Sequence, residues 1–311
     1  MSLRVLFSLV VLSLLSACAS TDYVQTAEAK YPPIGQFVEV EGLRIHYLDE
    51  GEGPAVILLH GAQSNIRDWS FALVDKLKGK HRVVAFDRPG LGYSDRPEAG
   101  ADVPAEQARI LKTAADKLGV GKAVIVGHSF GGAVAAAWTV NYQDDVVGLI
   151  SLAGATHDWG GTNRTLYTIG ASGVGPVLGS AARAYVSGDR ALSLVNDAFA
   201  PNEPIPGYAE HLGIELALRP DTFRYNSTDI TNLSNHLATQ SKRYPEIEVP
   251  VVLIHGDADL TVPLENHSLK FYDDVPNGRL VVLPGVGHMV HQVSQPRIVE
   301  AIERLAGTMD Q

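Results

Sequence analysis

The stretch VIVGHSFGGAVAAAW, residues 124–138, decides how this chain folds. The apolar run at its start indicates a buried strand, and the small residues at its end indicate a closely packed helix. Between them, Gly127 and Gly131 stand two positions before and two positions after Ser129. Glycines at these places allow a sharp turn that strains its central residue, because a side chain at either position would clash. The stretch therefore predicts a strand, a tight turn and a helix, with Ser129 at the tip of the turn.

The pattern Gly-x-Ser-x-Gly in this context resembles the nucleophile elbow of the α/β-hydrolase superfamily. The resemblance implies that Ser129 is a catalytic nucleophile. It also implies that the backbone N–H of Phe130, at the helix N-terminus, stabilises an oxyanion. The alternative is a structural turn with glycines for close packing, as in dinucleotide-binding folds, in which Ser129 is inert. The partners found further along the chain favour the catalytic interpretation.

Continuous apolar runs predict the rest of the sheet. They occupy residues 55–59, 83–86, 123–126, 146–152, 251–254 and 280–283. Runs of this kind, bounded by Gly, Pro and Asp, are typical of parallel strands covered on both faces. Residues 36–48 instead alternate apolar and polar positions around Glu41-Gly42, which indicates an antiparallel hairpin. We therefore expect the α/β-hydrolase fold, with a mostly parallel central sheet and an N-terminal antiparallel hairpin.

One connection in this pattern is too long for a single crossover helix. It separates the strand ending near Ala153 from the strand starting near Val251, and its composition changes along the way. A long connection in a compact domain is usually functional, and a cap over the carboxyl ends of the strands would shape a pocket. We expect a mainly helical cap over residues 156–244, inserted into a hydrolase core of residues 35–155 and 245–311.

Two aspartates follow the strand VPVVLIHG, residues 249–256, and compete for the role of catalytic acid. By resemblance to the α/β-hydrolase pattern Gly-x-x-Asp-x-x-x-Pro, counted from Gly256, Asp259 is the acid of the triad. Asp257 is then a turn residue that bonds the backbone, as Asx residues in such turns usually do. It remains the alternative acid.

The candidate base follows the next strand, in LVVLPGVGHMVHQ, residues 280–292. The family pattern places the base directly after a small residue, which assigns the role to His288. His291 is the competitor, expected to pack or to face solvent. A serine hydroxyl needs a histidine to take its proton and an acid to orient that histidine. The order Ser129, Asp259, His288 is the order of α/β-hydrolase triads.

Upstream, ILLHGAQSNIRDW, residues 57–69, contains His60-Gly61-Ala62 after a strand. This resembles the oxyanion loop of the family, in which the residue after His-Gly donates its backbone N–H. The resemblance implies that Ala62 and Phe130 form the oxyanion hole. We interpret His60 as a buried structural histidine and Trp69 as a core or pocket-wall residue.

Two further motifs have structural interpretations, without a catalytic role. FDRPGLGYSDRP, residues 86–97, resembles a family block in which Asp87 and Ser94 are structural, and it lacks the lysine of a phosphate-binding loop. The segment around Asp158, residues 157–161, resembles the aspartate elbow of haloalkane dehalogenases. The residues after it do not form the small-residue helix that an elbow needs. We therefore expect Asp158 to lie at the start of the cap and not to act as a nucleophile.

The N-terminus differs from the rest of the chain. Arg4 precedes an apolar run over residues 5–15, too short to span a bilayer and typical of a signal peptide, which we assign to residues 1–17. Leu15-Ser16-Ala17-Cys18 resembles the lipobox of bacterial lipoproteins, which implies lipidation of Cys18 and a polar tether over residues 18–34. The resemblance implies an exported protein anchored on the periplasmic face of the outer membrane. The alternative is an ordinary signal peptide cut near Ala17 or Ala19, which would leave Cys18 as an unmodified thiol or remove it.

Composition excludes some functions and leaves others open. The formal charge of -10 argues against nucleic acid as a partner, and the single cysteine excludes an internal disulfide. We expect a serine hydrolase of the carboxylesterase type that acts through an acyl-enzyme on a small ester with a modest apolar acyl group, without metal or cofactor. Lactonase, carbon-carbon hydrolase and perhydrolase or haloperoxidase chemistry remain alternatives, as does a non-catalytic envelope lipoprotein with this fold.

Overall fold

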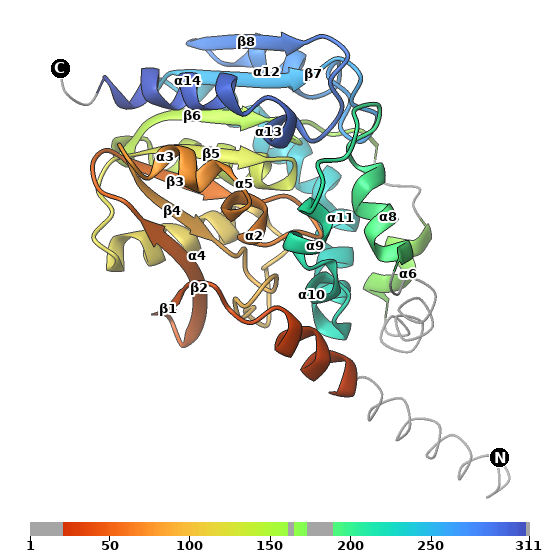
Figure 1. The fold of residues 1–311 in the computed structure, drawn as a ribbon. Helices are drawn as coiled ribbons and strands as arrows, with labels where there is room; N and C mark the ends of the chain where they lie inside the picture. Colours follow the sequence, from red (N-terminus) through yellow and green to blue (C-terminus); the bar gives the residue numbers. More distant parts are fainter. Residues whose placement is uncertain (1–20, 161–164, 173–188, 309–311) are drawn as a thin grey trace, which may run out of the picture.

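The computed structural model describes residues 21–160, 165–172 and 189–308 of the chain (Figure 1). Its centre is an eight-stranded sheet with the order β1-β2-β4-β3-β5-β6-β7-β8. The strands are β1 (Gln36–Val40), β2 (Leu43–Glu50), β3 (Ala55–Leu59), β4 (Arg82–Phe86), β5 (Ala123–His128), β6 (Val146–Leu152), β7 (Val251–Gly256) and β8 (Gly278–Leu283). Every apolar run that predicted a strand forms one, and the α/β-hydrolase fold is confirmed.

The expected hairpin is the pair β1 and β2, which lie antiparallel with Gln36 opposite Tyr47. Glu41 and Gly42 form its two-residue turn, both with positive φ, 53° and 81°. Such a turn matches the right-handed twist of the flanking strands. β2 also pairs antiparallel with β4, and all remaining pairs are parallel. The sheet is therefore mostly parallel, with its antiparallel part at one edge.

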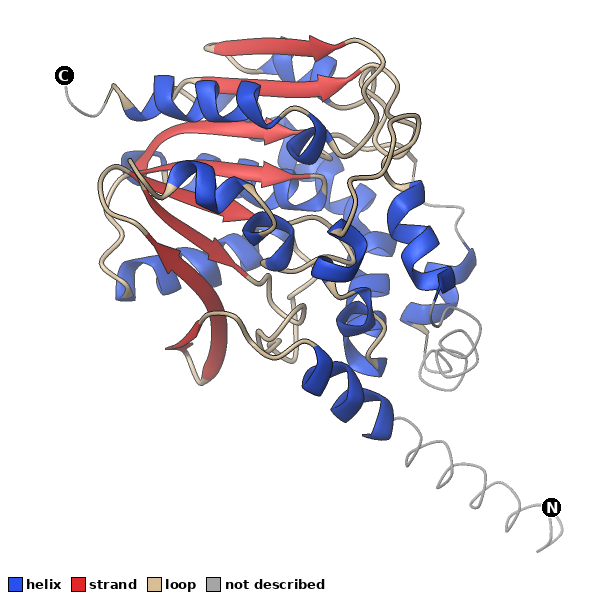
Figure 2. Ribbon diagram, viewed as in Figure 1, coloured by secondary structure: helices blue, strands red, loops and turns tan. Residues whose placement is uncertain are grey.

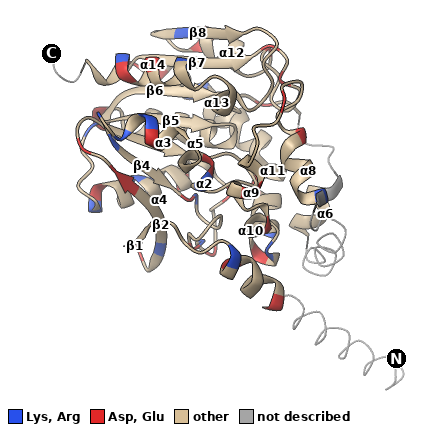
Figure 3. Cartoon of the chain, viewed as in Figure 1, with Lys and Arg blue, Asp and Glu red and all other residues tan. Residues whose placement is uncertain are grey.

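Helices cover both faces of the sheet, as Figure 2 shows. One face packs against α4 (Pro104–Lys117), α5 (Phe130–Asn141) and α12 (Ser268–Asp274). The other face packs against α2 (Arg67–Ser70), α3 (Leu73–Leu77), α13 (Val290–Val293) and α14 (Gln295–Ala306). Successive side chains of β3 alternate between the two cores, since Ile57 faces the first and Leu58 the second. Strands β3, β5, β6 and β7 contain no Asp, Glu, Lys or Arg, as their burial requires (Figure 3).

A group of helices connects β6 to β7. They are α6 (Thr165–Ala171), α8 (Asp189–Asp197), α9 (Tyr208–Leu212), α10 (Ile214–Ala217), α11 (Pro220–Gln240) and the 3-10 helix η2 (Ser241–Glu246). In Figure 1, α8 to α11 lie beyond the arrowheads of the strands, where the parallel strands end. Part of this group has a core of its own, in which Phe199, Tyr208 and Leu212 pack together with Met289. The expected cap boundaries, 156 and 244, remain a prediction.

The segment expected to be a polar tether contains a helix instead of a free chain. Residues 21–30 are helical and precede β1, and Figure 1 shows this helix beside α10. Ala27 and Tyr31, one turn apart, are buried against Leu216, and Lys30 pairs with Glu215 at 2.7 Å. The contact surface lies far away in the sequence, so local composition did not indicate it. The expected signal peptide, residues 1–17, and Cys18 lie outside the described residues.

Among the helices that the structure describes, none combines the length and the hydropathy needed to cross a bilayer.

Candidate active site

Ser129 lies at the turn between β5 and α5 in a strained backbone conformation, with φ 53° and ψ -119°. A Cβ at Gly127 would lie 2.2 Å from the carbonyl oxygen of Gly131, and a Cβ at Gly131 would lie 2.1 Å from that of Leu59. Both glycines are therefore required by backbone contact, as their spacing predicted. The turn is fixed further because the Ser129 carbonyl accepts a hydrogen bond from the N–H of Ala155 at 3.0 Å.

A histidine and a carboxylate meet beside this turn. Nδ1 of His288 lies 2.7 Å from Oδ2 of Asp259, and both residues are buried. The carboxylate can only accept while it is ionised, so Nδ1 carries the proton and Nε2 is left free to take another. This is the tautomer that a general base for a hydroxyl group requires. The structure therefore brings the predicted acid and base together.

Asp259 is held as an anion by several donors. Its Oδ1 accepts hydrogen bonds from the N–H groups of Thr261 and Val262, at 2.8 and 2.9 Å. Its Oδ2 lies 3.3 Å from Nε2 of His255 as well as 2.7 Å from His288. Burial alone would raise the pKa of Asp259, but the hydrogen bonds from His255 and His288 outweigh it and hold that pKa below its ordinary range. The carboxylate is therefore fixed in position and in charge.

Asp257, the alternative acid, lies elsewhere. Its side chain is exposed, and Oδ1 accepts a hydrogen bond from the N–H of Gly285 at 2.7 Å. This bond ties the loop after β7 to the loop after β8, which carries His288. Asp257 thus has the turn-stabilising contact that the sequence indicated, and Asp259 is the carboxylate that contacts His288.

Two backbone donors face the same region. Phe130 is the first residue of α5, and Ala62 follows β3; both line the cavity that Ser129 also lines. Within the parts of the chain that the structure describes, neither N–H donates to a protein acceptor. Unpaired N–H groups beside a hydroxyl are the arrangement that can hold an oxyanion. The two residues predicted for the hole therefore lie together with Ser129.

His60 has a structural environment, as expected. It is fully buried, Nδ1 donates to the carbonyl of Gly61 at 2.8 Å, and Nε2 accepts from the N–H of Arg88 at 3.0 Å. Burial, together with the charge of Arg88, lowers the pKa of His60 to about 4. The imidazole is therefore neutral near pH 7, with both nitrogens occupied by the backbone.

The cavity at Ser129 has a volume of about 720 Å³. Ser129, His288, Ala62 and Phe130 belong to its lining. Its walls carry mostly apolar side chains, among them Leu212, Ile214, Leu218, Phe223, Leu233 and Val262. Most of these belong to the helices between β6 and β7. Cavities of roughly 300–1,000 Å³ with apolar walls and few polar groups are typical of small-molecule sites.

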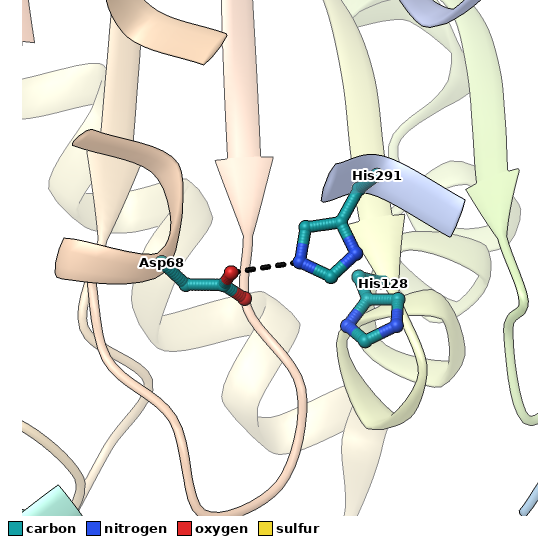
Figure 4. A group of neighbouring side chains, drawn as sticks. All are labelled: Asp68, His128 and His291. Carbon is teal, nitrogen blue, oxygen red and sulfur yellow. Dashed lines mark hydrogen bonds and ion pairs between the residues drawn. The ribbon is translucent and has the colours of Figure 1, made fainter. Parts of the chain in front are cut away.

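His291 pairs with a different aspartate, Asp68 (Figure 4). Its Nε2 lies 2.7 Å from Oδ1 of Asp68, and its ring stacks on the ring of His128 with the centroids 3.9 Å apart. His291 is fully buried. It therefore packs, which is one of the two outcomes expected for it.

One donor atom each from Asp68, His128 and His291 lies within 4.8 Å of the others, a spacing that a metal ion could use. However, Oδ1 of Asp68 already accepts hydrogen bonds from Tyr208 at 2.7 Å and Gln292 at 2.8 Å, besides that from His291. The two imidazole rings are stacked with a tilt of 36°, so their in-plane lone pairs do not converge on one point. We interpret the group as a hydrogen-bonded core that joins α2, α9 and α13.

The remaining motifs have structural contacts. Asp158 is exposed, bonds Ser234 of α11 and the N–H of Gly160, and is no part of the cavity lining; its neighbour Trp159 lines the cavity instead. Asp87 accepts hydrogen bonds from the N–H groups of Ile66 and Tyr93, at 2.7 and 2.8 Å. Trp69 is fully buried in the core and lies outside the lining.

Sequence reasoning missed three residues that shape the site. His255, four residues before Asp259, shares its carboxylate; the spacing is visible in the sequence, but the contact depends on the bend after β7. Asp68 organises the group behind Ser129. Arg88, inside a block interpreted as structural, contacts both His60 and Gly61. The sequence offered no signal for the last two, because their partners are distant.

The sequence model described as "Alpha/beta hydrolase family" matches residues 56–302. The chain therefore belongs to the α/β-hydrolase family, which the fold and the arrangement of the site also define.

Individual relatives are more distant. A 2-hydroxymuconate semialdehyde hydrolase of Pseudomonas putida is 29% identical over 309 residues, covering 91% of this chain and 98% of that protein. A 2-hydroxy-6-oxononadienedioate/2-hydroxy-6-oxononatrienedioate hydrolase of Paraburkholderia phymatum is 27% identical, covering 86% of this chain and 91% of that protein. The crystal structure of an esterase from a Rhodococcus species superposes with a TM-score of 0.68 at 23% identity, covering 88% of this chain and 98% of that one. At 23% identity, the comparison with the esterase structure shows similarity of fold only.

Proposed function

We propose that this α/β-hydrolase cleaves a carboxylic ester, or a closely related acyl bond, through an acyl-enzyme on Ser129. One observation carries the proposal: Ser129 is held at a strained turn in the wall of a cavity that His288 also lines, and His288 is oriented by Asp259 at 2.7 Å. Ester cleavage needs a nucleophile, a base, an oxyanion hole and water, and nothing more.

The proposed steps are those of a serine triad. Oγ of Ser129 attacks the acyl carbon while Nε2 of His288 takes the hydroxyl proton, and Asp259 stabilises the imidazolium. The carbonyl oxygen becomes an oxyanion that accepts hydrogen bonds from Ala62 and Phe130. The ester C–O bond then breaks, and His288 returns the proton to the leaving alcohol. Water, deprotonated by His288, attacks the acyl-enzyme and releases the acid and the free serine.

The charges of the cavity favour a neutral substrate. Among the described lining residues there is no lysine and no arginine, and the charged ones are Asp68 and Asp197. A substrate carboxylate is normally met by a cation or by converging donors, because an unpaired charge is costly in an apolar site. The dienedioate named for one relative would bring two carboxylates into this cavity. We therefore favour a neutral ester with an apolar acyl group over that class of carbon-carbon substrate.

A panel of p-nitrophenyl esters of increasing acyl length tests the proposal. We expect hydrolysis with a preference for acyl chains that the apolar walls can bury, and a loss of about 10³-fold or more in kcat for Ser129→Ala. Asp158→Ala is the matched control, because Asp158 is exposed and outside the lining, and it should keep wild-type turnover. Full turnover in Ser129→Ala would refute the proposal.

The same panel separates the alternatives. It should include a neutral lactone and a dienedioate with a carbon-carbon bond to be cleaved. A kcat/KM for the dienedioate that exceeds that of every ester would make carbon-carbon cleavage the main activity and contradict the proposed substrate class. Failure of a fluorophosphonate to label the protein, with no turnover of any substrate, would favour the non-catalytic alternative.

We further propose that the protein is exported and held at the cell envelope by a lipid on Cys18. The support is the sequence around Cys18, in which Leu15-Ser16-Ala17 precedes the single cysteine of the chain. Mass spectrometry of the mature N-terminus should find a lipid-modified Cys18, and Cys18→Ser should release the protein from membranes. An unmodified mature N-terminus other than Cys18 would contradict the proposal.

A further inference from the structure

Two side chains donate hydrogen bonds to the carbonyl group of the peptide unit that joins Gly61 and Ala62. The carbonyl oxygen of Gly61 accepts a hydrogen bond from Nδ1 of His60 at 2.8 Å and another from Nη2 of Arg88 at 3.1 Å. The N–H of Ala62 belongs to the same planar trans unit and points the opposite way. Donors on the carbonyl therefore fix the direction of this N–H and polarise it as a donor.

Arg88 contacts both halves of the oxyanion hole. Its Nε donates to the carbonyl of His60 at 2.9 Å, beside the bond from Nη2 to Gly61. Its guanidinium carbon also lies 4.1 Å from the ring centroid of Phe130, within the range of a cation–π contact. A single buried side chain thus touches the loop of Ala62 and the residue that supplies the second N–H.

The position of Arg88 depends on α11. Arg88 is fully buried, and its Nη1 lies 3.5 Å from Oδ2 of Asp229, a fully buried residue of α11. Gln107 bridges the pair, accepting from Arg88 at 2.8 Å and donating to Asp229 at 3.2 Å. Arg96 lies 2.6 Å from the other carboxylate oxygen. A guanidinium without this carboxylate would be a poorly compensated buried charge, so Asp229 is what allows Arg88 to stay in place.

A second bond joins α11 to the same loop. The N–H of Gln63, the residue after Ala62, donates to Oδ1 of Asn226 at 2.7 Å. Asn226 and Asp229 are three residues apart on α11 and therefore lie on one face of the helix. The loop is thus held by α11 on both sides of Ala62, directly at Gln63 and through Arg88 at Gly61.

We propose that Arg88, held in place by Asp229, is the positioning residue of the oxyanion hole, and that the docking of α11 sets the geometry of that hole. The inference rests on the proposed function, because the hole has a task only when an acyl carbon is attacked. It goes further by linking the helices above the cavity to the reacting groups.

Arg88→Lys tests the proposal, because a lysine keeps the charge but cannot donate to both carbonyls in the planar arrangement of a guanidinium. Arg96→Lys is the matched control: Arg96 shares Asp229 and its side chain is only 7% exposed, but its hydrogen bonds within the described residues go to Pro89 and Asp229 and not to the oxyanion loop. We expect kcat for a p-nitrophenyl ester to fall about 10- to 100-fold in Arg88→Lys, with KM changed less than about 3-fold. Arg96→Lys should stay within about 3-fold of wild type.

Comparison with a thionoester distinguishes a role in the oxyanion hole from a purely structural role, which would lower the turnover of both esters equally. Sulfur is a poorer hydrogen-bond acceptor than oxygen, so wild type should prefer the oxygen ester strongly. In Arg88→Lys, the ratio of kcat/KM for the oxygen ester to kcat/KM for the thionoester should be smaller than in wild type. The reason is that the oxygen ester depends more strongly on the aligned N–H of Ala62. An unchanged ratio in Arg88→Lys, or equal losses in both lysine variants, would overturn the proposal.

Hydrogen exchange of the Gln63 amide separates this inference from the proposed function. The exchange should be at least about 10-fold faster in Arg88→Lys than in wild type and unchanged in Arg96→Lys. If wild type hydrolyses no ester, the proposed function fails, but the exchange of the Gln63 amide still tests whether Arg88 holds the loop. Equal exchange rates in wild type and Arg88→Lys would overturn the role of Arg88. If Arg88→Lys does not fold, Asp229→Asn replaces it in every measurement, with the same expected direction.

Discussion

Replacing Asp259 by asparagine leaves the volume of the side chain almost unchanged and removes one acceptor. Oδ1 of Asp259 accepts from two backbone N–H groups, so the amide oxygen of an asparagine would keep that place. The amide NH₂ then faces His288 at the position of Oδ2, 2.7 Å from Nδ1. It also faces Nε2 of His255, which is itself a donor because it bonds the carbonyl of Val262 at 2.7 Å.

A donor at this position reverses the tautomer of His288. Nδ1 must become the acceptor, so Nε2 carries the proton and cannot take one from Ser129. The imidazolium that forms during attack also loses its counter-charge. In a serine triad, a change of this kind lowers kcat by about 10⁴-fold, which corresponds to about 5.5 kcal/mol of lost transition-state stabilisation. We expect a loss of that order in Asp259→Asn, with KM changed much less.

The assay is the turnover of a p-nitrophenyl ester, with circular dichroism to establish that the variant is folded. Asp257→Asn is the matched control, because Asp257 lies two residues away and is exposed, and its side chain accepts a hydrogen bond from the backbone N–H of Gly285 instead of contacting His288. It should keep kcat within about 3-fold of wild type. Equal losses in the two variants, or a large loss in Asp257→Asn alone, would refute the assignment of Asp259 to His288.

Three further predictions concern stability. Gly131→Ala should lower the free energy of unfolding by about 1–3 kcal/mol, because the added Cβ meets backbone; Gly121→Ala, where nothing lies within 4 Å, should lower it much less in the same urea titration. The pKa of His60 falls from 6.5 unfolded to about 4 folded, mainly through burial. The unfolded chain therefore binds a proton that the folded chain does not, and stability falls as the pH drops through that window. From about pH 7 to about pH 5 this group should remove about 2 kcal/mol; a free energy that stays constant would contradict a neutral buried His60. Asp68→Asn should lower the free energy of unfolding by about 1–3 kcal/mol, because it weakens the charge-assisted hydrogen bonds from Tyr208, His291 and Gln292. Thermal and urea unfolding curves unchanged from wild type would show that these bonds contribute nothing to stability.

Features fixed by neighbouring residues were predictable from the sequence. Gly127 is required by a contact inside the turn, with Gly131, so the spacing of the glycines indicated the elbow; Gly131 is required by its contact with Leu59 of the neighbouring strand β3. The parallel strands β3, β5 and β7 were visible because both faces of each are buried and polar positions become rare. β8 is only partly buried, and its apolar run at residues 280–283 still indicated it. Asp259 was separated from Asp257 only by resemblance to a family pattern, and the contact with His288 now supports that choice.

Features fixed by distant residues were not predictable. Asp68 and His291 are 223 positions apart, and nothing near either one signals the other. The helix at residues 21–30 packs on α10 through Ala27 and Leu216, a contact that the polar composition of this segment does not indicate. Arg88 occupies a motif whose glycines explain the turn, while its own role depends on α11, far along the chain. Long-range contacts of this kind follow from the fold and from no local pattern.

The most direct test of the central claim is the reaction of the intact protein with a fluorophosphonate, followed by mass spectrometry of its peptides. We expect one phosphonyl group per chain, attached to Ser129, with labelling slowed strongly in His288→Ala and abolished in Ser129→Ala. Labelling at another residue, or no labelling of a folded protein that still hydrolyses esters, would contradict the account.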